Sequence, residues 1–279
     1  MKEFGSAPEG IELRKWTDWM AMDASADFTY SREMHQLRDI GSEKIPILSL
    51  LKYLFVRPSV LASFSEVLKT NEEALESRIK RRGNVEHLDH FEALLPANAP
   101  APTQKEKTHI GIITGHLVIA GYEPIASQIY STIIFSLLEP TCLDYLVKEI
   151  RMAFRKYDDI QIKDLGSLQY IHASLMETLR ITVLQSSGQP RVSPGATVDG
   201  HHVPKGVTVS YAFLAFTRDS RYFHDAHSYR PQHWLPEGHP LWDPAQGPRP
   251  CPGLPLAWQE TRLFLAKVLW QFDAEMLPN

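Results

Sequence analysis

Apolar side chains recur at helical spacing in three segments near the start of the chain. Residues 11–30 show this spacing, residues 45–56 form an apolar piece that ends before Pro58, and residues 59–82 form a longer amphipathic segment. Basic side chains close the third segment ahead of Gly83, an arrangement that is typical of a helix C-terminus. We therefore predict three helices and interpret these basic residues as a solvated helix end rather than a binding surface.

An Ala/Pro-rich link at residues 96–102 separates these helices from a much longer helical pattern. The capping box Thr103-Gln104-Lys105-Glu106 opens that pattern, which continues to about Leu138. Two further segments with helical spacing follow over residues 140–154 and 168–180. The central part of the chain is therefore predicted to be entirely helical.

The pattern changes after the last of these helices. Short β-branched runs at 197–198 and 207–209 lie beside Gly-containing turns and are predicted to be strands. Residues 218–250 are rich in Pro, His and Asp with little periodicity, which favours an irregular, packed meander, and a last helix is predicted from about Gly253. The fold class is accordingly mainly α with a small β region.

Composition narrows the classes of function. The net charge of −4 argues against nucleic acid as a partner. The apolar stretch 110–121 is interrupted by His116 and is too short to cross a bilayer, so we predict no transmembrane segment. With only two cysteines the chain has no disulfide framework, which suits a reducing, intracellular compartment, and Cys142 is predicted to be an inert core thiol.

The other cysteine, Cys251, lies among prolines and glycines directly before the last predicted helix. A cysteine at the start of a helix faces the positive end of the helix dipole, and Arg249 adds positive charge, so the setting favours a thiolate. Prolines fix the backbone and glycines let a flat group approach closely. The segment therefore predicts an anionic sulfur ligand beneath a large flat group, and the alternative is a buried cysteine in a proline-rich loop.

This segment resembles the heme-ligand signature of the cytochrome P450 family: aromatic, two residues, Gly, one residue, Arg, one residue, Cys, one residue, Gly. Gly247, Arg249, Cys251 and Gly253 match, whereas Pro244 stands at the aromatic position. The resemblance implies a partial cytochrome P450 fold with a long central helix. It also implies that heme b is bound, with the Cys251 thiolate as the iron ligand and the other matching residues around the cofactor.

Two further segments resemble the same family in the right order. Glu177 and Arg180 lie three apart on a predicted helix and so share a face. Residues 229–234 resemble the family's aromatic-x-Pro-Glu-Arg-Trp segment, with Gln232 and His233 in place of Glu and Arg. The resemblance implies a buried network that joins the helix to the meander. Histidine is shorter than arginine, so we expect Glu177 to have a weaker partner, at a cost to stability and heme retention.

Residues 120–125 resemble the family's Ala-Gly-x-Glu-Thr-Thr stretch, which crosses the distal face of the heme. The resemblance implies that Gly121 leaves room for dioxygen, that Glu123 belongs to the proton-delivery route, and that Ala120 borders the substrate. Pro124 replaces the threonine, so it removes a hydroxyl, frees the carbonyl of Ala120 and kinks the helix. The alternative is a core helix with an ordinary proline kink.

Two loop residues complete the candidate site. Arg191 lies where the family has a basic residue that pairs with a heme propionate, and a surface charge is the alternative. Gln185 lies in the loop that lines the substrate pocket in the family, and with Ala120 and Pro124 it makes up the predicted substrate pocket.

The resemblance covers residues from about 11 to 273. We expect one partial domain over residues 1–279, with N-terminal helices at 11–95 and a heme-binding core at 103–279. Full-length members are longer, so the resemblance implies an N-terminally truncated chain without the anchor that usually holds members on the cytosolic face of the endoplasmic reticulum.

The function implied by the resemblance is that of a heme-thiolate monooxygenase oxidising a small apolar substrate, in fungal secondary metabolite biosynthesis. Electrons would come from a separate NADPH-dependent reductase, since the sequence shows no flavin or nicotinamide motif. Two alternatives stay open: a degenerate or truncated non-catalytic relative, and a heme enzyme without oxygen activation (an isomerase, a dehydratase or a peroxide-dependent enzyme).

Overall fold

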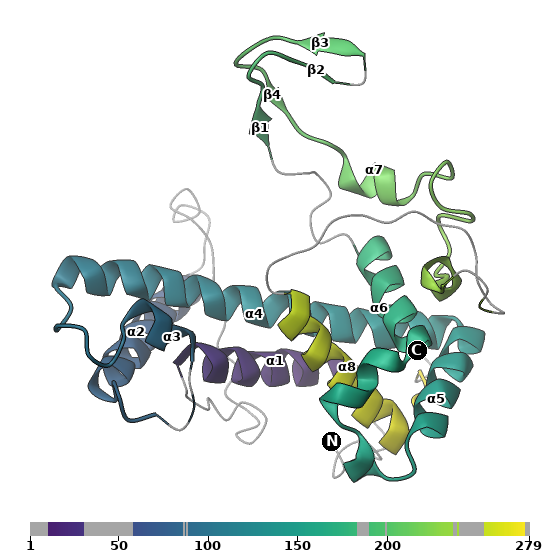
Figure 1. Ribbon diagram of the computed structural model, residues 1–279, viewed down its shortest axis with the longest axis horizontal. Helices are drawn as coiled ribbons and strands as arrows, with labels where there is room; N and C mark the ends of the chain where they lie inside the picture. Colours follow the sequence, from purple (N-terminus) through teal and green to yellow (C-terminus); the bar gives the residue numbers. More distant parts are fainter. Residues whose placement is uncertain are drawn as a thin grey trace. The chain divides into compact units, whose positions relative to one another are not determined.

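The computed structural model is mainly helical with a small β region (Figure 1). The residues it describes are 11–30, 58–85, 87, 89–182, 190–198, 200–236, 239 and 254–276. The chain forms two compact units, Met1–Ser127 and Gln128–Asn279. Their boundary falls inside the longest helix, α4 (Gln104–Leu138), and not at the link 96–102.

In the first unit, α1 (Leu13–Tyr30) and α2 (Pro58–Lys80) confirm the predicted helices at 11–30 and 59–82. The helix expected at 45–56 lies outside the described residues. A short helix, α3 (His90–Leu94), was not predicted, and Asp89 caps it by accepting a hydrogen bond from the Glu92 N–H at 3.0 Å.

A small apolar core joins α2, α3 and the start of α4. Its buried members come from α2, α3, the residue after α3 and the start of α4: Ala74, Leu75, Phe91, Leu95 and Ile110. Arg78 lies fully buried beside this core and binds both carboxylate oxygens of Asp89, at 2.6 and 2.9 Å. This bidentate pair anchors the chain that leads from α2 into α4.

The capping box at the start of α4 is confirmed. The backbone N–H and the hydroxyl of Thr103 lie 2.7 Å from the same carboxylate oxygen of Glu106, and the Glu106 N–H lies 3.4 Å from the Thr103 hydroxyl. Among the described helices, α4 alone is long and apolar enough to cross a membrane. Its second half is a core helix, because Ile125, Ala126, Ile129 and Ile133 are all buried. Length and composition are therefore weak evidence that α4 crosses a membrane.

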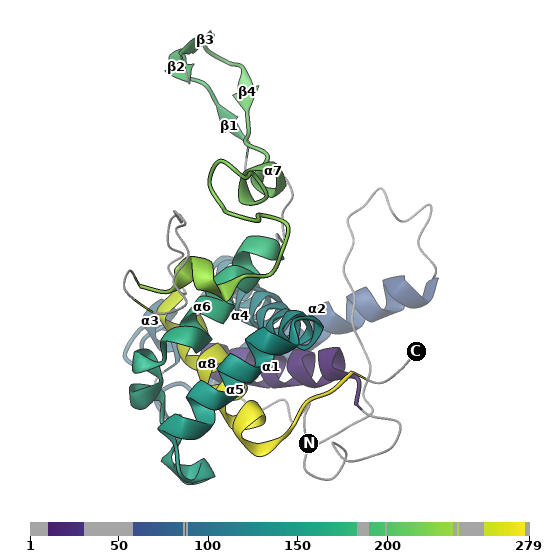
Figure 2. The same cartoon turned by 90° about the vertical axis from the view of Figure 1, so that its right-hand side faces the viewer.

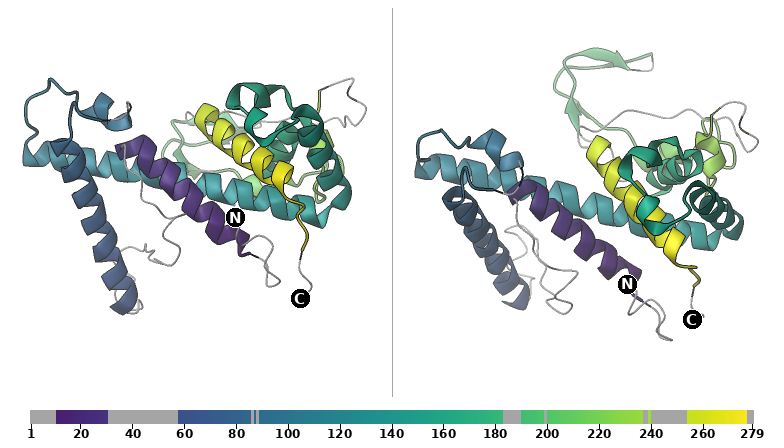
Figure 3. Two further views of the ribbon diagram at one scale, coloured as in Figure 1. Left: turned by 90° about the horizontal axis from the view of Figure 1, so that it is seen from below. Right: turned by 60° about the horizontal axis from the view of Figure 1, so that its bottom comes forward.

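The second unit is built around α6 (Gln169–Ile181). Helix α5 (Pro140–Ala153) packs against it, and α8 (Leu254–Gln271) lies along α5 and the short 3-10 helices η2 (Tyr157–Asp159) and η3 (Ile162–Ser167), as Figure 3 shows. The helices predicted at 140–154, at 168–180 and from about Gly253 are therefore confirmed.

Two small antiparallel pairs make up the β region: β1 (Arg191–Val192) with β4 (Thr208–Val209), and β2 (Ala196–Val198) with β3 (His201–Val203). Both pairs lie beyond the short helix α7 (Phe213–Thr217) from α6 (Figure 2). The meander then passes through the 3-10 helix η4 (Pro231–Trp234), which packs on α6.

Candidate functional site

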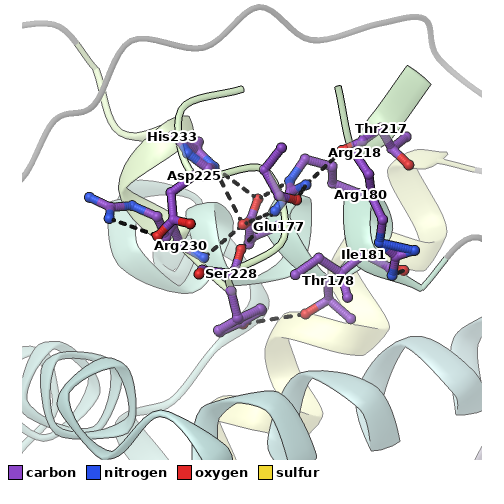
Figure 4. A network of polar contacts seen from close by, with 12 residues as sticks. Glu177, Thr178, Arg180, Ile181, Thr217, Arg218, Asp225, Ser228, Arg230 and His233 are labelled. Atoms are coloured by element: carbon purple, nitrogen blue, oxygen red, sulfur yellow. Dashed lines mark hydrogen bonds and ion pairs between the residues drawn. The ribbon is translucent and has the colours of Figure 1, made fainter. Parts of the chain in front are cut away.

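A buried ion pair on α6 is the centre of the best-defined polar site (Figure 4). Arg180 donates from Nη2 to Glu177 Oε1 at 2.6 Å and from Nε to Oε2 at 2.8 Å, so the pair is bidentate. Their side chains are 1% and 0% exposed. Isolated charges at such depth would cost several kcal/mol, so their further partners decide whether the arrangement is stable.

The remaining N–H groups of Arg180 donate to the meander. Nη1 lies 2.6 Å from the carbonyl oxygens of both Thr217 and Ala226, and Nη2 lies 2.9 Å from that of Ser228. A guanidinium has five N–H donors, and every one of them is therefore used here. Arg180 thus fixes the path of the chain after α7 from a rigid position on α6.

Glu177 is equally well satisfied. Its Oε1 accepts from the backbone N–H of Arg230 at 2.7 Å, and its Oε2 accepts from the indole N–H of Trp234 at 2.8 Å. Burial on its own would raise the pKa of Glu177, but hydrogen bonds from Arg180 and His233 outweigh burial and lower that pKa below its usual value. The carboxylate therefore stays ionised while fully buried.

His233 is a more distant member of this network. Its Nε2 lies 2.6 Å from the carbonyl oxygen of His224, so that nitrogen carries a proton and donates. Its Nδ1 lies 3.4 Å from the Glu177 carboxylate. The short side chain is a weak partner, as its length predicts, and Trp234 supplies the nearer donor.

A second layer of contacts ties this network to α4. The Tyr229 hydroxyl donates to the carbonyl of Ser174 at 3.1 Å, and its ring stacks on Phe135 of α4 with centroids 5.4 Å apart. Gln128 of α4 donates its side-chain N–H to the carbonyl of Leu175 at 2.7 Å. Helix α4, helix α6 and the meander therefore form one packed assembly within the second unit.

Substituting Trp234 with Phe is expected to destabilise the chain by about 1.5–3 kcal/mol, because the lost hydrogen bond is to an ionised group. Trp270 provides the matched control, since its indole N–H donates to a neutral carbonyl, that of Phe154, at 3.0 Å. Trp270→Phe is expected to cost only about 0.5–1.5 kcal/mol. Urea unfolding of both variants measures the difference. Equal losses of stability would show that Trp234 does not stabilise the charge of Glu177.

The segment 120–125 lies on α4 in the first unit, shortly before that unit ends at Ser127. Gly121 lies where α1 meets α4: a Cβ added to it would be 2.7 Å from the Ser25 hydroxyl oxygen. That hydroxyl donates to the carbonyl of Val118 at 2.7 Å. The missing Cβ of Gly121 therefore has a packing role against α1, a role that the sequence alone did not show.

Glu123 lies on the other side of α4 from Gly121 and is exposed, as are Ala120 and Pro124. Ile112 and Ile119, which are 56% and 47% exposed, extend the face of Ala120 and Glu123 by helical spacing. We call these four residues, Ile112, Ile119, Ala120 and Glu123, the α4 stripe. Helix α4 continues without interruption through Pro124, so within the described residues the proline does not end or divide it.

Acidic side chains from α1 and α4 lie close together beside this stripe. Burial raises the pKa of Asp18, Arg14 opposes that rise, and the nearby Glu123 carboxylate adds to it. Burial also raises the pKa of the Tyr122 hydroxyl, and the charges of Asp18 and Glu123 raise it further. Glu123 therefore lies in a polar, acidic corner close to Asp18 and Tyr122.

The other candidate residues are placed as follows. Arg191 is exposed on β1, and its guanidinium donates to the carbonyl of Pro190 at 3.1 Å. Five residues from the sequence prediction lie outside the described residues: Gln185, Gly247, Arg249, Cys251 and Gly253.

Comparison with known proteins gives a consistent result. The family model described as cytochrome P450 matches residues 6–279. The chain is 41% identical over its whole length to the cytochrome P450 monooxygenase TwmD of Talaromyces wortmannii, covering 61% of that protein. It is 29% identical over 98% of its length to the cytochrome P450 monooxygenase BOA3 of Botryotinia fuckeliana, covering 60% of it. A third relative is the cytochrome P450 monooxygenase poxC of Penicillium oxalicum, 31% identical over 86% of this chain and 52% of that protein.

Proposed function

Because this chain belongs to the cytochrome P450 family, we propose that it forms the heme-binding part of a monooxygenase that oxidises an apolar small molecule. The chain spans about 60% of the length of the curated relatives it matches. Those relatives are fungal monooxygenases by name, which supports a role in fungal secondary metabolism. The exposed isoleucines of the α4 stripe, Ile112 and Ile119, are the observation that supports the substrate class, because exposed apolar side chains suit an apolar ligand.

The two cysteines differ in how well each is suited to be a heme ligand. Cys142 is buried beside Tyr229, and burial raises the pKa of its thiol, so it does not provide an exposed thiolate. Cys251 is the remaining cysteine and lies shortly before the start of α8 at Leu254. A helix start is the setting that favours a thiolate ligand. Heme b bound through Cys251 would supply the oxidising chemistry, with the thiolate pushing electron density toward the iron.

The remaining residues have supporting roles in this proposal. The buried Glu177–Arg180 network holds the meander that leads toward the cysteine segment, which agrees with its depth and its many backbone partners. We assign Glu123 to the proton-delivery route, as the family pattern implies. Arg191 is free of any acidic partner within the described residues, so its guanidinium is suited to a heme propionate. Electrons would come from a separate NADPH-dependent reductase, at the cytosolic face of the endoplasmic reticulum.

The test is a carbon monoxide difference spectrum of the purified, reduced chain expressed with heme precursor. A thiolate-type shift of the main heme band is the expected result. Absence of that band, with heme present, would overturn the proposed ligation. Absence of bound heme would instead favour a non-catalytic relative.

One observation favours a second candidate function, a heme enzyme that does not activate oxygen with a reductase. Pro124 offers no hydroxyl at the position where the family pattern has threonine. Peroxide-dependent turnover, isomerisation and dehydration do not require that hydroxyl for proton delivery. Turnover with peroxide, and none with reductase and dioxygen, would select this candidate over the monooxygenase.

A further inference from the structure

A guanidinium, an imidazole and an indole ring meet between α6 and α8. Arg262 and Trp258 are four residues apart on α8 and therefore share a face of that helix. The guanidinium carbon of Arg262 lies 5.2 Å from the centre of the Trp258 ring, and the ring centre of His172, on α6, lies 5.1 Å from it. Nη2 of Arg262 lies 2.9 Å from Nδ1 of His172. These three side chains therefore connect two helices of the second unit.

The hydrogen bond between Arg262 and His172 fixes the protonation state of the imidazole. A guanidinium has only N–H donors, so Nδ1 of His172 accepts and carries no proton. The imidazole is therefore neutral, with its proton on Nε2. The surroundings favour the same state, because burial lowers the pKa of His172 and the charge of Arg262 lowers it further.

The other charged side chains on the packed elements do not contribute to that shift. On α5, the Glu149 carboxylate accepts from the backbone N–H groups of Tyr170 and Ile171 at 2.7 and 2.9 Å. On α8, burial alone raises the pKa of Glu260 to about 7, so Arg262 does not neutralise that carboxylate. The remaining titratable charged groups on α5, η2, η3, η4 and α8 are Asp144, Lys148, Arg151, Asp158, Asp159, Lys163, Asp164, His233 and Lys267. In the described part of the chain, no carboxylate offsets a second positive charge at His172.

Protonation of His172 would reverse the sign of its contact with Arg262. The proton would occupy the lone pair of Nδ1 that now accepts, and two cations would then lie side by side. Arg262 cannot relieve this repulsion by losing its own proton, since a guanidinium stays charged in proteins even where burial lowers its pKa. Its Nε is buried and has no hydrogen-bond partner among the described residues, so the bond to His172 is the stabilising polar contact at stake.

We infer that Arg262 and His172 form a pH-sensitive latch, which holds the first half of α8 (residues 254–262) on α6 near neutral pH and releases it when His172 is protonated. The second half of α8 should stay in place, because Leu265, Ala266 and Leu269 are buried in the second unit whatever the charge of His172. The latch goes beyond the proposed function, since it requires neither heme nor substrate.

The direction of the pH dependence follows from the lowered pKa of His172. Such a group stabilises the fold above its ordinary value, which is 6.5 for this imidazole, and that contribution is lost as pH falls toward the folded value. Glu260 acts in the opposite direction: its pKa is raised, so its contribution is present below 4.5 and is lost as pH rises through about 7. The stability of the wild-type chain alone therefore does not isolate His172.

His172→Asn isolates it, because the side-chain oxygen of asparagine can take the place of Nδ1 as the acceptor and does not titrate. Urea unfolding of the wild-type chain and the variant is compared from about pH 7.5 to about pH 5. The difference in stability between the two proteins is expected to be constant above pH 6.5. Below that pH the unfolding equilibrium constant of the wild type should rise severalfold relative to the variant, while the titration of Glu260 is common to both. A difference that stays constant throughout would overturn the inference.

Arg262→Met tests the other partner through the titration of His172 itself, followed by NMR on the histidine-labelled chain. Removal of the cation is expected to raise the pKa of His172 toward its ordinary value. Lys267→Met is the matched control: it also removes a cation from α8, but Lys267 lies 4.3 Å from the centre of the Tyr157 ring and does not affect the pKa of His172. An unchanged titration in Arg262→Met, or an equal change in Lys267→Met, would show that the two residues are not coupled.

Hydrogen exchange shows whether protonation releases the helix. At about pH 5.5 the amides of the first half of α8 are expected to exchange faster in the wild type than in His172→Asn, and those of the second half at the same rate in both. At about pH 7.5 the two proteins should not differ in either half. Because the proteins are compared at the same pH, the intrinsic pH dependence of exchange cancels. Equal exchange of the first half at both pH values would exclude the latch.

Discussion

Substituting Arg180 with Ala is expected to cost about 3–5 kcal/mol in the free energy of unfolding, which is a large part of the stability of an ordinary domain. The change would leave the buried Glu177 carboxylate without its bidentate partner. It would also remove the donors from three carbonyl oxygens of the meander, those of Thr217, Ala226 and Ser228. Urea unfolding of the wild-type chain and the variant measures the loss.

Arg151 provides a closely matched control for this experiment. It also bonds a carboxylate, that of Asp273 at 2.8 Å, and two carbonyls, but its side chain is 38% exposed and that of Asp273 is 90% exposed. Solvent screening should therefore limit the cost of Arg151→Ala to about 0–1 kcal/mol. Similar losses of unfolding free energy in the two variants would show that burial does not increase the contribution of the Arg180 network to stability.

The same pair of proteins gives a pH test. The pKa of Glu177 is lowered in the folded chain, so its contribution to stability is present above the ordinary value of 4.5 and is lost as pH falls through the folded value. Without Arg180, burial would dominate and raise that pKa, so the folded variant would favour the protonated form. The stability gap between wild type and variant is therefore expected to be largest at high pH, to narrow as pH falls through the raised pKa of the variant, and to go on narrowing until pH falls below the lowered pKa of the wild type. A stability gap that does not change with pH would show that the loss comes only from the three carbonyl oxygens that Arg180 no longer binds.

The long helices of this fold could be predicted because their apolar period is sustained over many residues. Helix α4 is the clearest case, since a capping box marks its start and the pattern continues to Leu138. The short elements could not be predicted in this way. Helices α3 and α7 have five residues each, too few to show a helical period, and each lies where tertiary contacts or a local cap decide the backbone.

Only part of the Glu177–Arg180 network could be predicted from the sequence. The spacing of Glu177 and Arg180 predicts that they share a helix face, and the structure shows them paired. The three carbonyl partners of Arg180 could not be foreseen, because a backbone acceptor has no side-chain signature. The part played by Trp234 was missed although a signal existed: an indole N–H that is removed from water needs an acceptor, and the nearest strong one on α6 is Glu177.

The segment 120–125 shows a different limit of prediction from sequence. Sequence analysis assigned Gly121 a role toward dioxygen, yet its missing Cβ accommodates Ser25 from α1, a residue far away in the chain. Helical periodicity could have separated the two sides of α4, because Gly121 lies roughly opposite the stripe that contains Ile112, Ile119 and Glu123. Which of those sides another helix would cover depends on the path of α1, and no local pattern reveals that path.

Substituting Cys251 with Ala is expected to abolish the thiolate-type carbon monoxide band completely, the largest functional effect of any single change proposed for this chain. Alanine cannot ligate iron, so bound heme would be held by apolar contact and propionate pairing alone, and its retention during gel filtration should fall at least about tenfold. The helical circular dichroism should be unchanged, because the buried residues of α4, α5 and α6 pack against one another.

Cys142→Ala separates the loss of a ligand from the loss of a cysteine. Cys142 lies in a buried cluster with Ile181 and Tyr229, so its truncation leaves a small cavity and should lower stability by about 1 kcal/mol. The thiolate-type band should persist in this variant, since its sulfur is enclosed by the core of the second unit. If Cys142→Ala removed the band and Cys251→Ala kept it, the metal ligand would have to be reassigned to Cys142.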